Sequence, residues 1–118
     1  MTEMYRKSAF MNMNYRYMRI LVMFDLPVLT QENLKNYRAF RKYLLKSGFI
    51  MLQESVYCKL TPNGVACDNA VNGIKRNKPP VGLVQVLRVT EKQFQKMEYV
   101  VGKKKSEIID SDERVILL

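Results

Sequence analysis

The feature that most constrains the fold is an unbroken apolar run at residues 20–24 (ILVMF), which ends on Asp25 and is followed by Pro27. Apolar side chains at every position indicate a strand that is covered on both faces. Because Pro27 has no N–H to donate to a sheet, we expect the strand to span residues 17–26. Asp25 then ends the most hydrophobic strand of the chain, either as a turn residue that bonds its own backbone or as a functional carboxylate.

The rest of the chain alternates between helical and strand patterns. Thr30 is a good N-cap for a helix that ends near Lys46, before Gly48. Thr61 is expected to cap a second helix, with Pro62 at its first position. The remaining strands are expected at residues 49–52, 55–60 and 81–89. This β-α-β-β-α-β order predicts an α+β, ferredoxin-like fold.

The chain is expected to have three parts. Residues 1–16 lack periodicity and are expected to be a disordered N-terminal extension; residues 17–102 would form the ferredoxin-like domain, and residues 103–118 a C-terminal tail. A capping box at Thr90 opens a helical turn, and a short fifth strand is expected at residues 98–101. The apolar end at 114–118 predicts an extra C-terminal strand, which adds either to its own sheet or to a partner.

The expected fold places both helices on one face of the sheet and leaves the other face open. The strand at residues 17–26 nevertheless has the pattern of a strand buried on both sides. A second copy of the same sheet would cover the open face, so the sequence predicts a sheet-to-sheet homodimer.

The charge balance favours a polyanionic partner. The chain carries 20 Lys and Arg against 11 Asp and Glu, a net charge of +9. Four of the acids fall in residues 107–118, so the rest of the chain is more basic still. Such a charge suits a nucleic acid, because Lys and Arg release counterions when they neutralise phosphates.

Composition excludes several kinds of site. The sequence has no histidine, which removes His-based nucleophile pairs and His-ligated zinc. Cys58 and Cys67 are too few for a metal cluster and are expected to be small buried hydrophobes. Without a disulfide framework a reducing, cytoplasmic location is expected. No apolar run approaches the ~18 residues of a membrane span, so no membrane partner is expected.

Basic residues recur at helical spacing between Thr30 and Lys46, without acids in the body of that helix to offset them. Such a row is either a solvated face or a phosphate-facing one, and like-charge repulsion within it favours the second. A basic, proline-closed loop at residues 75–80 adds further cations. The candidate nucleic-acid-binding residues are Lys35, Arg38, Arg41, Lys42, Lys46, Lys75, Arg76 and Lys78.

Three motifs taken together resemble one family. An apolar strand ends in aspartate within VMFDLP, a Gly48-Phe49 pair follows the basic helix, and residues 53–57 (QESVY) form a Gln-x-Ser-Val-aromatic strand. Over residues 18–102 the chain resembles the small CRISPR-associated adaptation protein, the second core protein of spacer acquisition, and looks most like members from type II systems.

The resemblance implies a function and partners. Members form homodimers that sit between copies of the CRISPR integrase subunit and scaffold them on duplex DNA, the prespacer. Many are also described as magnesium-dependent endonucleases, with the metal assigned to the strand-end aspartate. That role maps onto Asp25, as both catalytic residue and metal ligand. Whether the substrate is RNA or DNA is left open by the resemblance.

One carboxylate is a poor magnesium site, since Mg²⁺ takes about six oxygen ligands and keeps several waters. A two-fold axis would supply Asp25 twice, and two carboxylates on one Mg²⁺ per dimer could activate water beside a phosphate. Two other functions compete. An RNA-recognition module shares this element order but stacks bases on exposed strand aromatics, where the sequence offers only Tyr57. A toxin-like ribonuclease of related fold would also use Asp25.

Overall fold

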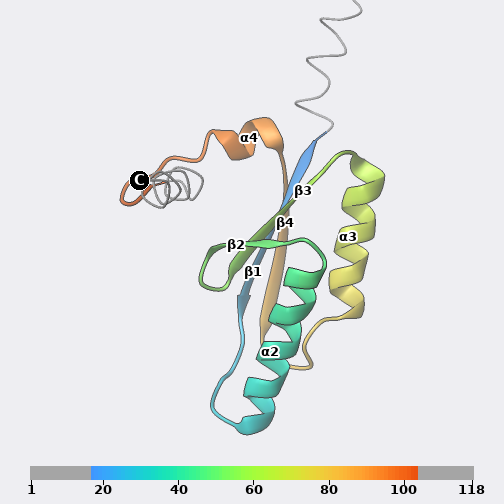
Figure 1. The fold of residues 1–118 in the computed structure, drawn as a ribbon, viewed down its shortest axis with the longest axis vertical. Coiled ribbons are helices and arrows are strands. Elements are labelled where there is room, and N and C mark those ends of the chain that lie inside the picture. Colours follow the sequence, from blue (N-terminus) through green and yellow to red (C-terminus); the bar gives the residue numbers. More distant parts are fainter. Residues whose placement is uncertain (1–16, 104–118) are drawn as a thin grey trace, which may run out of the picture.

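The computed structural model describes residues 17–103, and its four strands form one antiparallel sheet in the order β2-β3-β1-β4. The elements are β1 (Met18–Asp25), α2 (Gln31–Lys46), β2 (Ile50–Gln53), β3 (Val56–Thr61), α3 (Gly64–Arg76), β4 (Leu83–Thr90) and α4 (Glu91–Gln95). The two long helices lie side by side on one face of the sheet (Figure 1). This arrangement confirms the α+β, ferredoxin-like prediction. The predicted extension at 1–16 and the strand at 114–118 lie outside the described residues.

Strand β1 is covered unequally on its two faces. Ile20, Val22 and Phe24 alternate along it and are almost fully buried against the helices. Leu21 and Met23 point to the other face and are only half-buried. The unbroken apolar run therefore reflects one fully packed face and one partly covered face within a single chain.

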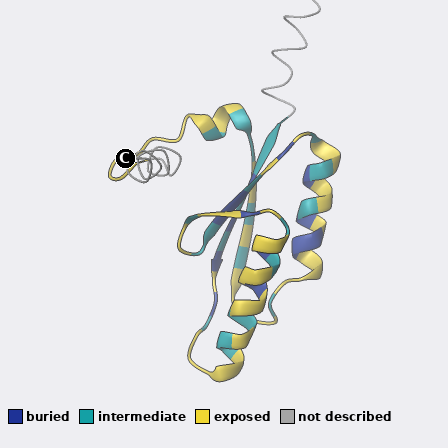
Figure 2. Ribbon diagram, in the orientation of Figure 1, coloured by how far each residue is buried: buried dark blue, intermediate teal, exposed yellow. Residues whose placement is uncertain are grey.

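Aromatic residues fill the space between sheet and helices, where Figure 2 shows the buried positions. The Phe24 ring meets Phe40 edge-on at 5.3 Å and stacks on Tyr57 at 5.7 Å between centroids. Such contacts add about 0.5–1.5 kcal/mol each beyond the burial of apolar area. The core thus fixes α2 onto the two central strands, β1 and β3.

Local signals at the helix ends account for most element boundaries. The Thr30 side chain accepts a hydrogen bond from the Asn33 amide at 3.0 Å, which confirms it as the N-cap of α2. Gly48 has a φ of 89°, a left-handed conformation that glycine adopts without strain. The capping box predicted at Thr90 is also present, with Gln93 as its second member.

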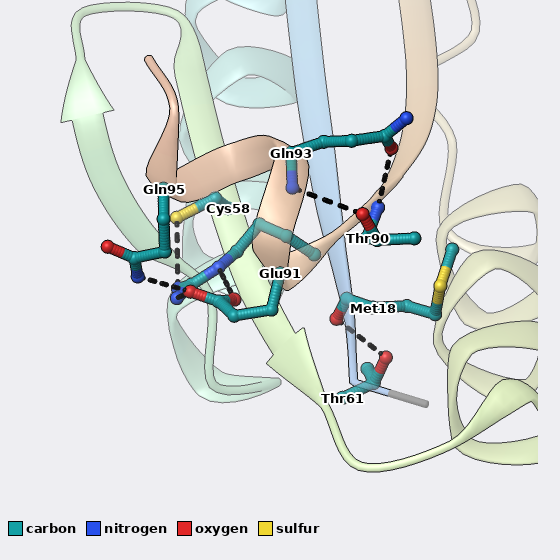
Figure 3. Close-up of polar contacts among 8 residues, drawn as sticks. Met18, Cys58, Thr61, Thr90, Glu91, Gln93 and Gln95 are labelled. Carbon is teal, nitrogen blue, oxygen red and sulfur yellow. Dashed lines mark hydrogen bonds and ion pairs between the residues drawn. The ribbon is translucent and has the colours of Figure 1, made fainter. Parts of the chain in front are cut away.

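The predicted cap of the second helix is wrong. Asn63 caps α3, since its side chain accepts from the Ala66 amide at 2.8 Å. Thr61 instead ends β3, is buried, and donates its hydroxyl to the Met18 carbonyl at 2.9 Å (Figure 3). Thr61 and Asn63 could both cap a helix, but the Thr61 hydroxyl is used in pairing β3 with β1, which leaves Asn63 as the cap.

The fifth strand predicted at residues 98–101 is also wrong. The chain leaves the sheet at Thr90, the end of β4, and residues 98–101, which follow α4, form no strand. Val100 and Val101 are 93% and 90% exposed, and no strand within residues 17–103 pairs with them. Strand β4 likewise begins at Leu83 rather than at residue 81.

Gly82 explains why β4 starts there. Its φ is 104°, which interrupts the extended backbone. A Cβ at this position would lie 2.9 Å from the Asp25 carbonyl oxygen and 2.7 Å from Leu26 Cδ2. The glycine therefore lets the loop before β4 press directly on the end of β1, and it fixes the backbone that carries Asp25.

Gly82→Ala is expected to destabilise the protein by about 2–4 kcal/mol, since a side chain here meets both backbone strain and a backbone clash. Chemical denaturation followed by circular dichroism measures this loss. Gly64→Ala is the matched control, because nothing lies within 4 Å of its added Cβ and it opens a helix. We expect that variant to be at least as stable as the parent. Equal effects at both glycines would contradict the packing described for Gly82.

Candidate nucleic-acid interface

All eight basic residues named from the sequence are exposed, and the structure places them on the helical side of the molecule. None of them forms an ion pair within residues 17–103, where both ion pairs involve other residues. Exposed cations without carboxylate partners repel one another and attract counterions. Cations of this kind release their counterions when they neutralise phosphates, so the helical layer is the candidate surface for a nucleic acid.

Helix α2 presents its cations in two directions. Lys35, Lys42 and Lys46 fall on the side opposite the buried Phe40 and Leu44, and so face outward. Arg38 and Arg41 turn toward the turn between β2 and β3, where they line a hollow. The row predicted from spacing is thus an outward lysine face and a separate arginine flank.

The basic loop after α3 lies against α2. Asn77, Lys78, Pro79 and Pro80 share a hollow of about 160 Å³ with four residues of α2. The two helices also approach closely: a Cβ on Gly73 would lie 2.3 Å from the Tyr43 hydroxyl oxygen. The loop predicted at residues 75–80 is shorter than expected, because Lys75 and Arg76 form the last turn of α3 and, of its three cations, only Lys78 lies in the loop. Lys78 borders the same hollow as four uncharged residues of α2.

Asp25 is exposed at the end of β1, where it pairs in register with Leu83 of β4. Side chains alternate along a strand, so Asp25 shares the helix-free face with Leu21 and Met23. In the described part of the chain, no group of three Asp, Glu, Cys or His residues could hold a metal ion. One chain thus supplies a single strand-end carboxylate, which does not by itself fit magnesium.

The helix-free face is apolar. Strand register places Leu60, Leu83 and Leu87 on it, and these side chains are 41–53% exposed. Beside them, Met97 and Tyr99 from the segment after α4 help to line a hollow of about 280 Å³ over Leu21 and Met23. Exposed leucines on three positions of one sheet face are typical of a surface that meets another protein.

An ion pair that sequence reasoning missed fixes α4 to the sheet. Arg19 donates from Nε and Nη2 to the two carboxylate oxygens of Glu91, at 2.9 and 2.7 Å. Its guanidinium also lies 4.3 Å from the Phe94 ring centroid. Nη1 contacts Cys58 Sγ at 3.9 Å, and Figure 3 shows Cys58 and Glu91 on this side of the sheet. Because 72 positions separate the partners, no local pattern could have revealed the pair.

Burial of the Glu91 carboxyl favours its neutral form, but hydrogen bonds from Arg19 and Gln95 outweigh that effect, so its pKa is lowered. Burial likewise opposes the charge of Arg19, yet Glu91 raises the pKa of the guanidinium. A carboxyl with a depressed folded-state pKa stabilises fully above its unfolded pKa of about 4.3. The stabilisation is lost as the pH falls through the folded value.

Glu91→Gln is expected to lower the free energy of unfolding by about 1–2 kcal/mol at neutral pH, because it leaves Arg19 half-buried without its counter-charge. The difference from the parent should shrink as the pH falls through the lowered folded-state pKa of Glu91, below which the carboxyl is protonated in both the folded and the unfolded state. Urea unfolding across pH measures both effects. The exposed pair of Arg88 with Asp68 is the control, and Asp68→Asn should leave the midpoint unchanged. A pH-independent difference for Glu91→Gln would refute the electrostatic role.

Comparison with known proteins decides the family. The model of the family described as CRISPR associated protein Cas2 matches residues 18–97. A protein of Treponema denticola named CRISPR-associated endoribonuclease Cas2 is 57% identical over 101 residues, which cover 86% of this chain and all of the relative. Proteins of the same name from Lacticaseibacillus rhamnosus and Streptococcus mutans are 42% and 46% identical, again over 86% of this chain and over 100% and 93% of theirs.

The chain belongs to the Cas2 family. This confirms the resemblance drawn from the strand-end aspartate and the motifs that follow α2, and Asp25 lies within the matched residues. Membership also implies partners from a CRISPR system.

The geometry of the sheet also argues against an RNA-recognition module, in agreement with the Cas2 assignment. Such a module needs aromatic rings exposed on its central strands. Tyr57 is 1% exposed and pairs in register with buried Val22, so its ring faces the helices. The residues of β1 and β3 that face away from the helices include no aromatic side chain. Among residues 17–103, no helix is both long and apolar enough to cross a bilayer.

Proposed function

We propose that this Cas2 family member is a spacer-acquisition subunit, which dimerises through its helix-free faces and scaffolds the CRISPR integrase subunit on duplex DNA. The observation that carries the proposal is the separation of two surfaces. Cations without carboxylate partners occupy the helical layer, and exposed leucines occupy the opposite face of the sheet. A sheet-to-sheet dimer buries the leucines and turns both cationic layers outward.

The cationic layers would bind the DNA backbone. Lysine and arginine contacts to phosphates fix the position and orientation of a duplex without reading its sequence. The lysines on the outward side of α2 and the loop cation Lys78 lie on neighbouring segments of one surface. Binding is therefore proposed to depend steeply on salt and weakly on base sequence.

Catalysis is the second part of the proposal. Asp25 lies on the face through which the dimer would form, and a two-fold axis that passes near the end of β1 would bring a second Asp25 toward the first. Two carboxylates would supply ligands for one Mg²⁺, which when bound lowers the pKa of a water ligand and neutralises phosphate charge. Relatives at 42–57% identity are named endoribonucleases, which supports RNA as the substrate of this hydrolysis. A free-standing, toxin-like ribonuclease would use the same pair and would arrest growth when expressed alone.

Sedimentation and capture experiments test the scaffold. Analytical ultracentrifugation at micromolar protein should show a dimer, and Leu87→Arg, on the helix-free face, should give a folded monomer. Val65→Arg is the matched control, because Val65 is 71% exposed on α3. The parent dimer should retain the integrase subunit and duplex DNA together in a pull-down. A monomeric parent, or capture of neither partner, would overturn the proposal.

A further inference from the structure

A second polar site lies between α2 and the turn that joins β2 to β3. It is a hollow of about 390 Å³, within the ~300–1,000 Å³ typical of small-ligand sites. We call it the hairpin hollow. Its lining residues are Tyr37, Arg38, Arg41, Met51, Glu54, Ser55 and Tyr57. The set combines two guanidinium groups, aromatic surface and one carboxylate, a mixture that suits neither a simple ion nor an apolar ligand.

Arg41 is held in place by a residue of the core. Its Nε donates to the Tyr57 hydroxyl at 2.9 Å, and Tyr57 is itself fixed in the core by its stacking on Phe24. Within the described residues the terminal nitrogens of Arg41 have no partner, and neither does the guanidinium of Arg38. The oriented guanidinium of Arg41 and the neighbouring, unpaired guanidinium of Arg38 line the same hollow, and guanidinium groups match the oxygens of a phosphate.

Tyr37 gives the hollow an aromatic wall. Its ring packs edge-on against Phe24 at 6.1 Å between centroids, so the half-buried side chain has a fixed position. Every nucleic-acid base has an apolar face that can pack against such a ring. The phosphate site and the aromatic wall are adjacent in sequence and border the same space.

Glu54 is the one acidic residue of the lining. An ionised carboxylate only accepts hydrogen bonds, so it repels phosphate and selects N–H groups. The turn that carries it is anchored, because the Phe24 amide donates to the Ser55 carbonyl at 3.0 Å. Glu54 therefore adds a carboxylate acceptor, carried on an anchored turn, to the same hollow that Arg38 and Arg41 line.

We propose that the hairpin hollow binds one unpaired nucleotide of a DNA whose duplex lies along α2. The phosphate binds Arg38 and Arg41, the base packs on Tyr37, and its Watson–Crick donors meet Glu54. A paired base has already used those donors, so a duplex interior does not qualify. Guanine is preferred, since its N1–H and N2–H are neighbouring donors, whereas thymine has one N–H flanked by carbonyl groups. This inference deepens the proposed function and rests on it.

Fluorescence anisotropy with the full-length protein tests the inference. The probes are one DNA hairpin with a blunt end, the same hairpin with a single-stranded thymidine extension, and the extension with one thymidine replaced by guanosine. The guanosine probe should bind about tenfold more tightly than the thymidine probe. Glu54→Gln should abolish this difference and leave the blunt hairpin unaffected. Glu98→Gln, an exposed carboxylate outside the hollow, should retain it.

A titration with 5′-GMP locates the site. In ¹⁵N-resolved spectra the amides of Glu54 and Ser55 should shift more than those of Lys42 and Lys46. Equal affinity for all three probes, with salt-dependent duplex binding intact, overturns the nucleotide site and leaves the scaffold function standing. Shifts centred on the outward lysines also overturn it. Failure of the parent to bind even the blunt hairpin refutes the proposed function itself.

Discussion

Reversing Lys42 and Lys46 to glutamate should weaken the binding of duplex DNA about 100-fold at physiological salt. Each phosphate contact contributes roughly fivefold at 0.15 M salt, and the new acids add repulsion to the loss of two contacts. Both side chains are exposed on α2 and make no ion pair within the described chain, so their reversal should not disturb the fold. Anisotropy titrations over a range of salt concentrations measure the effect, and the salt slope should fall by about 2.

Lys96→Glu provides the matched control for this reversal. Lys96 caps α4, away from the helical layer, and is equally exposed. The Lys96→Glu substitution changes the net charge in the same direction as each α2 substitution. If only the net charge mattered, each of the three substitutions would weaken DNA binding by the same factor. That outcome would remove α2 from the interface, whereas a small effect at Lys96 supports a localised one.

Asp25→Asn should reduce magnesium-dependent phosphodiester cleavage by at least about 100-fold. The amide retains the shape of the side chain but removes the negative charge from both Asp25 residues that would form the proposed metal site. Asp25 is exposed and its side chain makes no hydrogen bond or ion pair within residues 17–103, so dimerisation and DNA affinity should remain. The assay compares labelled single-stranded RNA and DNA with and without Mg²⁺.

Glu98→Gln is the control for cleavage as well, because it removes an exposed carboxylate elsewhere. Full cleavage by Asp25→Asn would assign the activity to a contaminant or to another residue. If the variant also loses DNA binding, Asp25 is needed for dimerisation or DNA binding, and its role in cleavage is indirect. Only a selective loss of cleavage supports the paired-aspartate site.

The sequence predicted those features of the fold that local chemistry determines. Thr30, Gly48 and Thr90 each determine an element boundary through their own side chain or backbone freedom, and the structure places all three as expected. The wrong predictions fall where a contact with a distant strand decides between structures that the local sequence equally allows. Thr61 is a competent cap, yet its hydroxyl is used by the neighbouring strand. Residues 98–101 have strand-forming side chains, but no strand in the described part of the chain lies beside them to pair with.

The candidate site was predictable in composition more than in arrangement. Spacing identified the cations of α2, but it could not separate the outward lysines from Arg41, whose direction depends on Tyr57 in another element. The apolar character of β1 overstated its coverage, because only alternate residues face the helices. Glu54 drew attention only as part of a motif, since its role depends on which helix the hairpin meets.

The close approach of α2 and α3 has a consequence for how any duplex would sit on this surface. The Tyr43 side chain occupies the volume that a side chain at Gly73 would need. The absence of a side chain at Gly73 therefore sets the distance between α2 and α3. The spacing between the α2 lysines and the proline-closed loop is therefore already fixed in the unbound protein. If a duplex binds this surface as proposed, its phosphate strands would have to match that spacing, so groove width rather than base identity would govern the fit.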